Sequence, residues 1–250
     1  MTYVYGTLVA IYGLFFGSFF NVVGLRVPKG ESIVTPPSHC VACKRPLRWL
    51  ELVPVLSWLA LRGSCKTCGE KISVVYPVVE AGTALLFVAV FVQWGWTAEC
   101  YIGWFAISVF ACLTAADFAY YKIPNKILFP GIAILAVARA FAHPLGLSTY
   151  LLGAIAGYVL LYLIALFSRG GMGYGDVKLF LFVGLFVGFS GMILTLVLAS
   201  FIGTIYGIVM RLLKKLGRRE RIAFGPFIAL ACVLVELYGE TLIHAYFAIL

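Results

Sequence analysis

The sequence predicts an all-α polytopic membrane protein with about eight transmembrane helices and one small cytoplasmic insert. The first supporting observation is composition, because 63% of the 250 residues are hydrophobic and only 12% are charged. A soluble domain usually carries about twice that charged fraction. The second is the repetition of long apolar runs, each able to form the roughly 20-residue helix that crosses a bilayer. The third is a polar loop of residues 26–75 that contains four cysteines.

Eight apolar segments are predicted to be the membrane spans. They run over residues 3–25, 76–96, 101–118, 126–142, 149–167, 177–188, 191–211 and 225–249. The sixth and seventh form one stretch that is too long for a single crossing, so we divide it at residues 188–191, where two glycines permit a tight turn. The first segment has neither a preceding basic residue nor a small-residue cleavage site, so we expect a retained helix and not a signal peptide.

The basic residues gather in alternate loops. Of the 19 lysines and arginines, 18 lie in 26–75, 119–126, 168–178 and 211–222, and only Arg139 lies elsewhere. Alternate loops share one side of the membrane, and the positive-inside rule makes that side cytoplasmic, with both termini outside. The net charge of +9 therefore indicates orientation and contact with anionic membrane lipids, and it argues against nucleic-acid binding.

The loop of residues 26–75 is predicted to be a zinc-binding insert. It carries two C-x2-C pairs, formed by Cys40, Cys43, Cys65 and Cys68. Two such pairs are typical of a structural zinc site with four thiolate ligands, and a segment this short needs such support to fold. Disulfides or unpaired thiols are the alternative, although the reducing cytoplasm disfavours disulfides. The chain thus divides into a first span (1–25), the insert (26–75) and a seven-helix domain (76–250).

The chain contains only two aspartates, Asp117 and Asp176. Asp117 ends the third predicted span and Asp176 opens the sixth, so both are expected at the cytoplasmic edge of the bilayer. A carboxylate there is costly unless it is paired or functional. Two carboxyls that share one proton supply the base and the acid that peptide hydrolysis needs, so we predict an aspartyl dyad. The alternative is an N-cap role for Asp176 and an interfacial role for Asp117.

The residues around Asp176 are candidates for the substrate approach. Gly173 and Gly175 have no side chains, so a peptide backbone could come close to the carboxylate, and Lys178 follows two residues after Asp176. Because a helix N-terminus favours negative charge, Asp176 is expected to be the more readily ionised aspartate and Asp117 the proton carrier.

Several motifs resemble those of type IV prepilin peptidases, which belong to the GxGD class of membrane aspartyl proteases. Residues 173–179 are similar to the family's GxGDxKL signature, and Asp117 is followed six residues later by an Ile-Pro pair, as in the family. Residues 17–23, 51–58, 76–80 and 224–227 resemble further family motifs, so the resemblance spans most of the chain.

The resemblance implies a bifunctional enzyme of the bacterial plasma (inner) membrane. It would cleave the short basic leader of prepilins or pseudopilins on the cytoplasmic face, with Asp117 and Asp176 as the proteolytic pair. It would then methylate the new N-terminal amine with S-adenosylmethionine as co-substrate. The sequence leaves open the pathway (type IV pilus assembly, type II secretion or DNA uptake) and whether the chain forms a homo-oligomer.

Three further residues are candidates for co-substrate or leader binding. Glu51 and Trp58 lie between the cysteine pairs and could hold the ribose hydroxyls or the sulfonium, or else pack the insert. Glu80 begins the second span and could bind the leader or the co-substrate, or else form a structural hydrogen bond.

Two wider alternatives complete the sequence-based hypotheses. One is a GxGD protease with a different membrane substrate, and the other is a non-enzymatic scaffold or transporter with a zinc-stabilised loop. Glu236, Glu240 and His244 share one face of the last helix, where they could form a metal or proton path or a polar stripe between helices.

Overall fold

A computed structural model describes residues 2–168, 172–213 and 222–249. Within these residues the chain forms helices, turns and two isolated bridges but no strand, which confirms the all-α prediction. Six basic residues of the predicted cytoplasmic loops lie outside the described part, namely Arg169, Lys214, Lys215, Arg218, Arg219 and Arg221.

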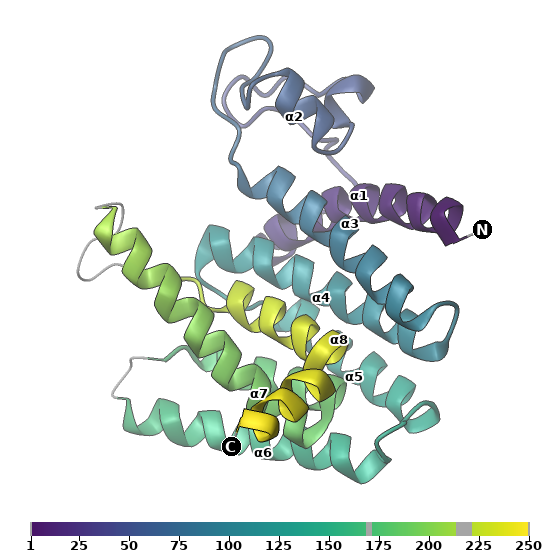
Figure 1. Ribbon diagram of the computed structural model, residues 1–250. Helices are drawn as coiled ribbons and strands as arrows, with labels where there is room; N and C mark the ends of the chain where they lie inside the picture. Colours follow the sequence, from purple (N-terminus) through teal and green to yellow (C-terminus); the bar gives the residue numbers. More distant parts are fainter. Residues whose placement is uncertain (1, 169–171, 214–221, 250) are drawn as a thin grey trace.

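Seven long helices make up the bundle (Figure 1). They are α1 (Thr2–Arg26), α3 (Val75–Trp94), α4 (Ala98–Tyr120), α5 (Asn125–Phe141), α6 (Leu147–Phe167), α7 (Tyr174–Leu212) and α8 (Gly225–Ile249). Among the described residues, five of them (α1, α3, α4, α6 and α7) are long and apolar enough to cross a membrane. This confirms a polytopic membrane protein, because helices that are apolar on all sides are stable only in a large core or a bilayer.

The seven helices correspond to the eight predicted segments because α7 is broken. Gly188 lies inside it with φ 74° and ψ −174°, a conformation that only glycine adopts readily. The predicted division at residues 188–191 is therefore confirmed. The break is sharper than expected, since a single residue leaves the helical conformation. The two halves of α7 pack closely on α6.

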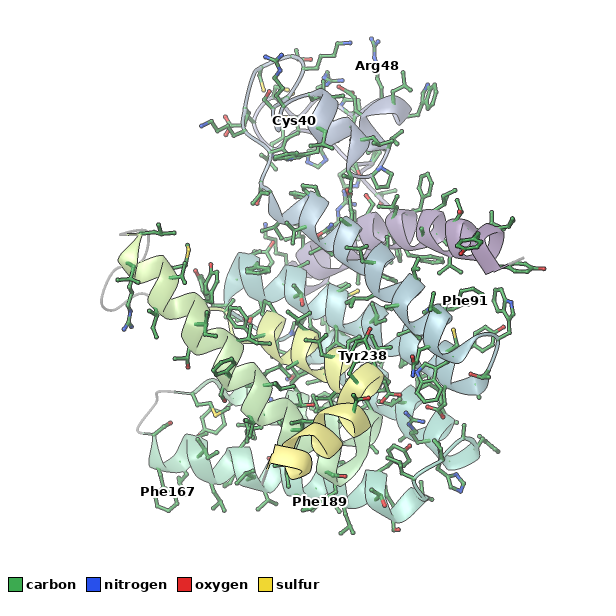
Figure 2. The ribbon with its side chains drawn as sticks, viewed as in Figure 1. Cys40, Arg48, Phe91, Phe167, Phe189 and Tyr238 are labelled. Carbon is green, nitrogen blue, oxygen red and sulfur yellow. The ribbon has the colours of Figure 1, made fainter. Side chains whose placement is uncertain are left out.

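The insert is a separate small unit at one end of α1 and α3. It contains the 3-10 turns η1 (Val27–Lys29) and η2 (Trp49–Leu52) and the short helix α2 (Leu56–Ala60). Figure 1 shows α2 set apart from the seven-helix bundle, and Figure 2 shows Cys40 and Arg48 in this unit. Its size is small, so its stability has to come from something other than a large apolar core.

One end of the bundle collects the termini of several helices. The end of α4 and the starts of α5 and α7 line one cavity together with η1, and the first residue of α8 contacts α4 there. This arrangement follows from alternate loops lying on the same side. It also brings residues that are far apart in the sequence into one place.

Candidate active site

Asp117 lies in the last turn of α4, where the helix is ended by a left-handed residue. Tyr121 has φ 52° and ψ 40°, and its amide donates to the Asp117 carbonyl at 2.8 Å. Ile123 and Pro124 then keep the chain extended until α5 begins. This local stop fixes the depth of Asp117, whose side chain is only 6% exposed.

The Asp117 carboxylate receives a hydrogen bond from another helix. The backbone amide of Gly225, at the start of α8, donates to Asp117 Oδ2 at 2.9 Å. The first amides of a helix have no partner within it and are free to bind an anion. No sequence pattern predicted this contact. The available signal was a glycine directly before Pro226, which marks the start of a helix.

Asp176 lies in the first turn of α7. The N-cap residue of α7 is Gly173, which has no side chain. Asp176 is therefore not the N-cap, contrary to the alternative considered from the sequence. The Asp176 side chain is half-buried and lines the same cavity as Asp117. We name this space, of about 440 Å³, the aspartate cavity; its walls are η1, the turn after α4, and the starts of α5 and α7.

The other residues predicted for the substrate approach also line the aspartate cavity, but in different ways. Gly173 is exposed, and a Cβ at this position would lie 3.4 Å from Asp176 Oδ2. Gly175 packs against Ile123, and a Cβ there would lie 3.1 Å from the Ile123 Cβ. Lys178 places its Nζ 3.4 Å from Asn125 Oδ1 and over the Phe129 ring. Gly173 thus leaves room beside the carboxylate, whereas Gly175 permits close packing.

The four predicted metal ligands converge in the insert. The sulfurs of Cys40, Cys43, Cys65 and Cys68 lie within 4.8 Å of one another, and all four are free thiols, so the alternative of disulfides is not found. The Cys40 and Cys68 sulfurs are 3.7 Å apart. A tetrahedral zinc ion with sulfur ligands at about 2.3 Å requires sulfurs about 3.8 Å apart, so the donor set fits such an ion.

Each cysteine pair lies in the same kind of turn. The amide of Lys44 donates to the Cys40 carbonyl at 3.0 Å, and that of Gly69 donates to the Cys65 carbonyl at 2.9 Å. Hydrogen bonds from the Cys68 and Thr67 amides lower the pKa of the Cys65 thiol to about 6. In the first turn, the Cys43 and Ala42 amides lower the pKa of the Cys40 thiol in the same way. A lowered thiol pKa favours the thiolate, which is the form that binds metals.

A second cavity lies between the insert and the ends of α1, α3 and α4. We name this space, of about 560 Å³, the insert cavity; it is lined by Glu51, Trp58 and Glu80, the three candidates for co-substrate binding, and by Cys40 and Cys65. The cavity is within the size range of small-molecule sites. The structure therefore brings the three candidates together, although each also has a structural partner.

The Glu51 carboxylate is occupied on both oxygens. Two Arg45 nitrogens donate to it at 2.8 and 2.9 Å, and the Arg48 amide donates at 2.8 Å. Arg45 above all, then the Arg48 amide, lower the pKa of Glu51 to about 2. The Trp58 indole donates to the Ile72 carbonyl at 3.1 Å. These contacts correspond to the packing role that was the alternative for Glu51 and Trp58.

Glu80 connects the bundle to the insert. Its side chain is 7% exposed, and its Oε2 accepts from the Val55 amide at 2.7 Å. Val55 has a strained backbone for a β-branched residue, with φ 61°. The hydrogen bond holds the strained residue just before α2, which is the structural alternative considered for Glu80.

The matches to known families cover both halves of this architecture. Residues 11–94 match the bacterial peptidase A24 N-terminal domain, and residues 104–208 match the type IV leader peptidase family. The chain belongs to the type IV leader peptidase family. The resemblance inferred from the motifs is thereby confirmed, and membership in a peptidase family excludes the scaffold or transporter alternative.

Curated relatives of the family match the chain over most of its length. The prepilin leader peptidase/N-methyltransferase of Bacillus subtilis (strain 168) is 37% identical over 240 residues, which cover 96% of this chain and 97% of that protein. Its counterpart from Myxococcus xanthus (strain DK1622) is 38% identical over 83% of this chain and 65% of that protein. The one from Aeromonas salmonicida (strain A449) is 31% identical over 98% and 95%. No solved structure matches the chain.

This leader peptidase also has a buried ion pair away from the aspartate cavity. Arg139 is 1% exposed and donates to both Glu99 oxygens, at 2.7 and 2.8 Å. It also donates to the Phe186 carbonyl at 2.8 Å, just before the break at Gly188, and stacks over the Tyr150 ring. The sequence signal was present, because Arg139 is the one basic residue outside the basic loops.

The polar stripe predicted on the last helix is only partly described. Glu236 lies half-buried on α8. The side chains of Glu240 and His244 lie outside the described part of the structure, so the prediction of a shared face stays a prediction for this leader peptidase.

Proposed function

We propose that the chain is an aspartyl endopeptidase that removes the basic leader of type IV prepilins or pseudopilins, with Asp117 and Asp176 as its catalytic pair. The observation that carries this proposal is that the only two aspartates of the chain line one cavity, although they belong to different helices. A pair of carboxyls in one partly buried space is the arrangement in which one proton is shared.

The dyad performs hydrolysis without a covalent intermediate. The ionised carboxylate takes a proton from water while the water oxygen bonds to the scissile carbonyl carbon, and the protonated carboxyl gives its proton to the carbonyl oxygen. The neutral gem-diol then collapses. The first carboxyl gives its proton to the leaving nitrogen as the carbon–nitrogen bond breaks, and a hydroxyl proton of the diol returns to the second carboxylate. Both aspartates end in their starting protonation states.

The cytoplasmic side of the bacterial inner membrane is the proposed location of the aspartate cavity. The support is the concentration of lysines and arginines in the loops at this end of the bundle, which the positive-inside rule assigns to the cytoplasm and to contact with anionic lipids. A prepilin carries a basic leader followed by an apolar helix. The apolar helix can partition into the bilayer and leave the scissile bond at the depth of the two aspartates. Exposed Gly173 leaves room there for the backbone of the prepilin.

Single substitutions test the dyad. Asp117→Asn and Asp176→Asn are each expected to lower leader cleavage of a purified prepilin by roughly 10⁴-fold, the scale seen when a catalytic acid or base is removed. Glu236→Gln is the matched control, because it removes a carboxylate from the bundle that does not line the aspartate cavity. Retained cleavage in either aspartate variant would rule out the dyad. If the enzyme cleaved unrelated single-span proteins but no prepilin, the alternative of a GxGD protease with a different membrane substrate would be favoured.

Methyl transfer from S-adenosylmethionine to the new N-terminus is the second proposed activity. The names of the relatives include N-methyltransferase, and the insert cavity has the size and the side chains for such a co-substrate. We propose that the Trp58 ring faces the sulfonium through a cation–π contact and that Glu80 contributes a polar wall. Because both Glu51 oxygens are occupied, Glu51 would shape the cavity and not hold the ribose. The co-substrate, when bound, supplies the methyl group.

A Trp58 series tests this second activity on a pilin peptide that has already been cleaved. Trp58→Ala is expected to abolish transfer of a labelled methyl group, whereas Trp58→Phe keeps an aromatic face and should retain part of it. Trp94→Phe, on the far end of α3, is the control. Zinc content and leader cleavage are measured in parallel to show that the insert and the bundle are folded. Normal methyl transfer by Trp58→Ala would move the site out of the insert cavity.

A further inference from the structure

The two aspartates differ in what contacts their carboxylates. Asp117 is almost fully buried, and its Oδ2 accepts the Gly225 amide at 2.9 Å. Asp176 is half-buried, and among the described residues no hydrogen-bond donor contacts its carboxylate. A dyad that works as base and acid needs one ionised and one protonated carboxyl. The difference in contacts therefore indicates which aspartate is ionised and which carries the proton.

We propose that Gly225 is a positioning residue whose backbone amide fixes Asp117 as the ionised member of the pair and leaves Asp176 as the member that carries the proton. This inference rests on the proposed function, since it takes the two aspartates as the proteolytic dyad. It reverses the expectation from the sequence, which considered the N-terminus of α7 but not that of α8.

The chemistry of the contact favours an anion on Asp117. A backbone amide can only donate, so Oδ2 presents a lone pair to it and carries no proton there. A hydrogen bond to an ionised acceptor is roughly twice as strong as one between neutral groups. Gly225 is the first residue of α8, where the unpaired amides give the helix end a partial positive charge. Asp176 also lies at a helix N-terminus, but in the described part of the chain no such donor contacts its carboxylate.

Close approach explains why a glycine occupies position 225. A Cβ built there would lie 2.9 Å from Asp117 Oδ2, 3.5 Å from its Cγ and 3.6 Å from its Cβ. Any side chain at 225 would therefore displace the carboxylate or the start of α8. Pro226 follows directly and stiffens the first turn, so the helix start cannot easily yield.

Among the described residues, the other charged groups that line the aspartate cavity form no hydrogen bond or ion pair with either aspartate. The aspartate cavity is also lined by Lys122 from the turn after α4, Lys126 from α5 and Lys178 from α7, whereas η1 contributes the apolar Val27 and Pro28. Cationic side chains in the cavity favour negative charge on the pair, but Lys178 is directed at Asn125 and no contact in the described part of the chain directs a lysine at either aspartate. Within residues 2–168, 172–213 and 222–249, the Gly225 amide is the one hydrogen-bond donor that contacts either carboxylate. In the reaction, Asp117 then takes the proton from water and Asp176 gives its proton to the scissile carbonyl oxygen.

A pH series on Gly225→Ala tests this assignment. The added methyl group displaces Asp117, so kcat for leader cleavage is expected to fall by roughly 10²-fold, the scale of a small misplacement, while KM stays unchanged. The acidic limb of the kcat–pH profile should move to higher pH, because the amide no longer favours ionised Asp117 in the working state. The basic limb, which reports loss of the Asp176 proton, should stay in place.

Gly203→Ala is the matched control, because the atoms nearest to a Cβ at Gly203 belong to Phe224, just before α8, and to Phe227 in its first turn, and not to Asp117. An unfolding transition in detergent micelles that matches the wild type confirms that the bundle of Gly225→Ala is folded. A normal kcat and pH profile in Gly225→Ala, or the same loss in Gly203→Ala, would overturn the positioning role. A shift of the basic limb alone would overturn the assignment and make Asp117 the proton donor. Failure of the dyad itself is separate, since it would show as retained cleavage in Asp117→Asn.

Discussion

The aspartate cavity and the insert cavity lie on two sides of the same short segments. In η1, Val27 and Pro28 line the aspartate cavity, whereas Lys29 lines the insert cavity. At the end of α4, Asp117 lines the aspartate cavity and Tyr120 lines the insert cavity. The aspartate cavity is made by helix termini that only tertiary packing brings together. The insert cavity is made largely by residues 38–76, whose turns are set by local spacing.

The difference shows two ways of holding polar groups at a membrane edge. In the bundle, the polar groups that meet come from different helices, as in the Asp117–Gly225 and Arg139–Glu99 contacts. In the insert, the four cysteines come from two turns of the same kind, and a metal ion would hold them together. The bundle should therefore tolerate loss of the metal, and the insert should tolerate changes at the far end of the bundle.

Loss of the metal should produce the largest effect. We expect purified protein to contain about one zinc ion per chain, and Cys40→Ser with Cys65→Ser to contain none. A structural zinc ion contributes roughly 10–16 kcal/mol in small zinc domains, so the insert should unfold and methyl transfer should be lost. Leader cleavage should persist. Cys100→Ala, a cysteine in the bundle, is the control for zinc content, and equal loss of both activities would show that the two regions are not independent.

Breaking the buried ion pair should affect the bundle alone. Arg139→Met leaves Glu99 and the Phe186 carbonyl without their donor, and removing one partner of a buried pair costs about 3–5 kcal/mol of unfolding free energy. Unfolding in mixed detergent micelles measures this loss, and zinc content should not change. Combining it with Glu99→Leu should recover part of the stability. A double variant as unstable as the single one would contradict this account of the pair.

The smallest effect is expected at the contact between the two regions. Glu80→Leu removes the acceptor for the strained Val55 amide, which costs about 1–3 kcal/mol for a buried unpaired group. Glu80→Gln keeps an acceptor oxygen and should lose less. Limited proteolysis of the insert is the measurement, with faster cleavage near α2 expected for Glu80→Leu. Equal protection in wild type and both variants would mean that the insert is held by other contacts.

The sequence by itself determined the spans, the metal ligands and the two aspartates. An apolar run of bilayer length is expected to be helical inside the membrane, because a helix forms all of its backbone hydrogen bonds within the segment. The cluster of four cysteines, which could hold a metal ion, was predictable because C-x2-C spacing acts within one turn. The break in α7 could be predicted for a similarly local reason, since Gly188 adopts a backbone conformation that other residues avoid.

Only the tertiary structure decided what each carboxylate contacts. No sequence pattern links Asp117 to the amide of Gly225, or Glu80 to that of Val55, because each pair meets through packing between elements far apart in the chain. The same holds for the shared cavity of Asp117 and Asp176. Their depth follows from where each helix ends, but their proximity depends on how α4, α7 and α8 pack. The expectation that Asp176 is the ionised member considered only the N-terminus of α7. The proposal that Asp117 is the ionised member comes from the packing of α8 against α4, which no sequence pattern predicts.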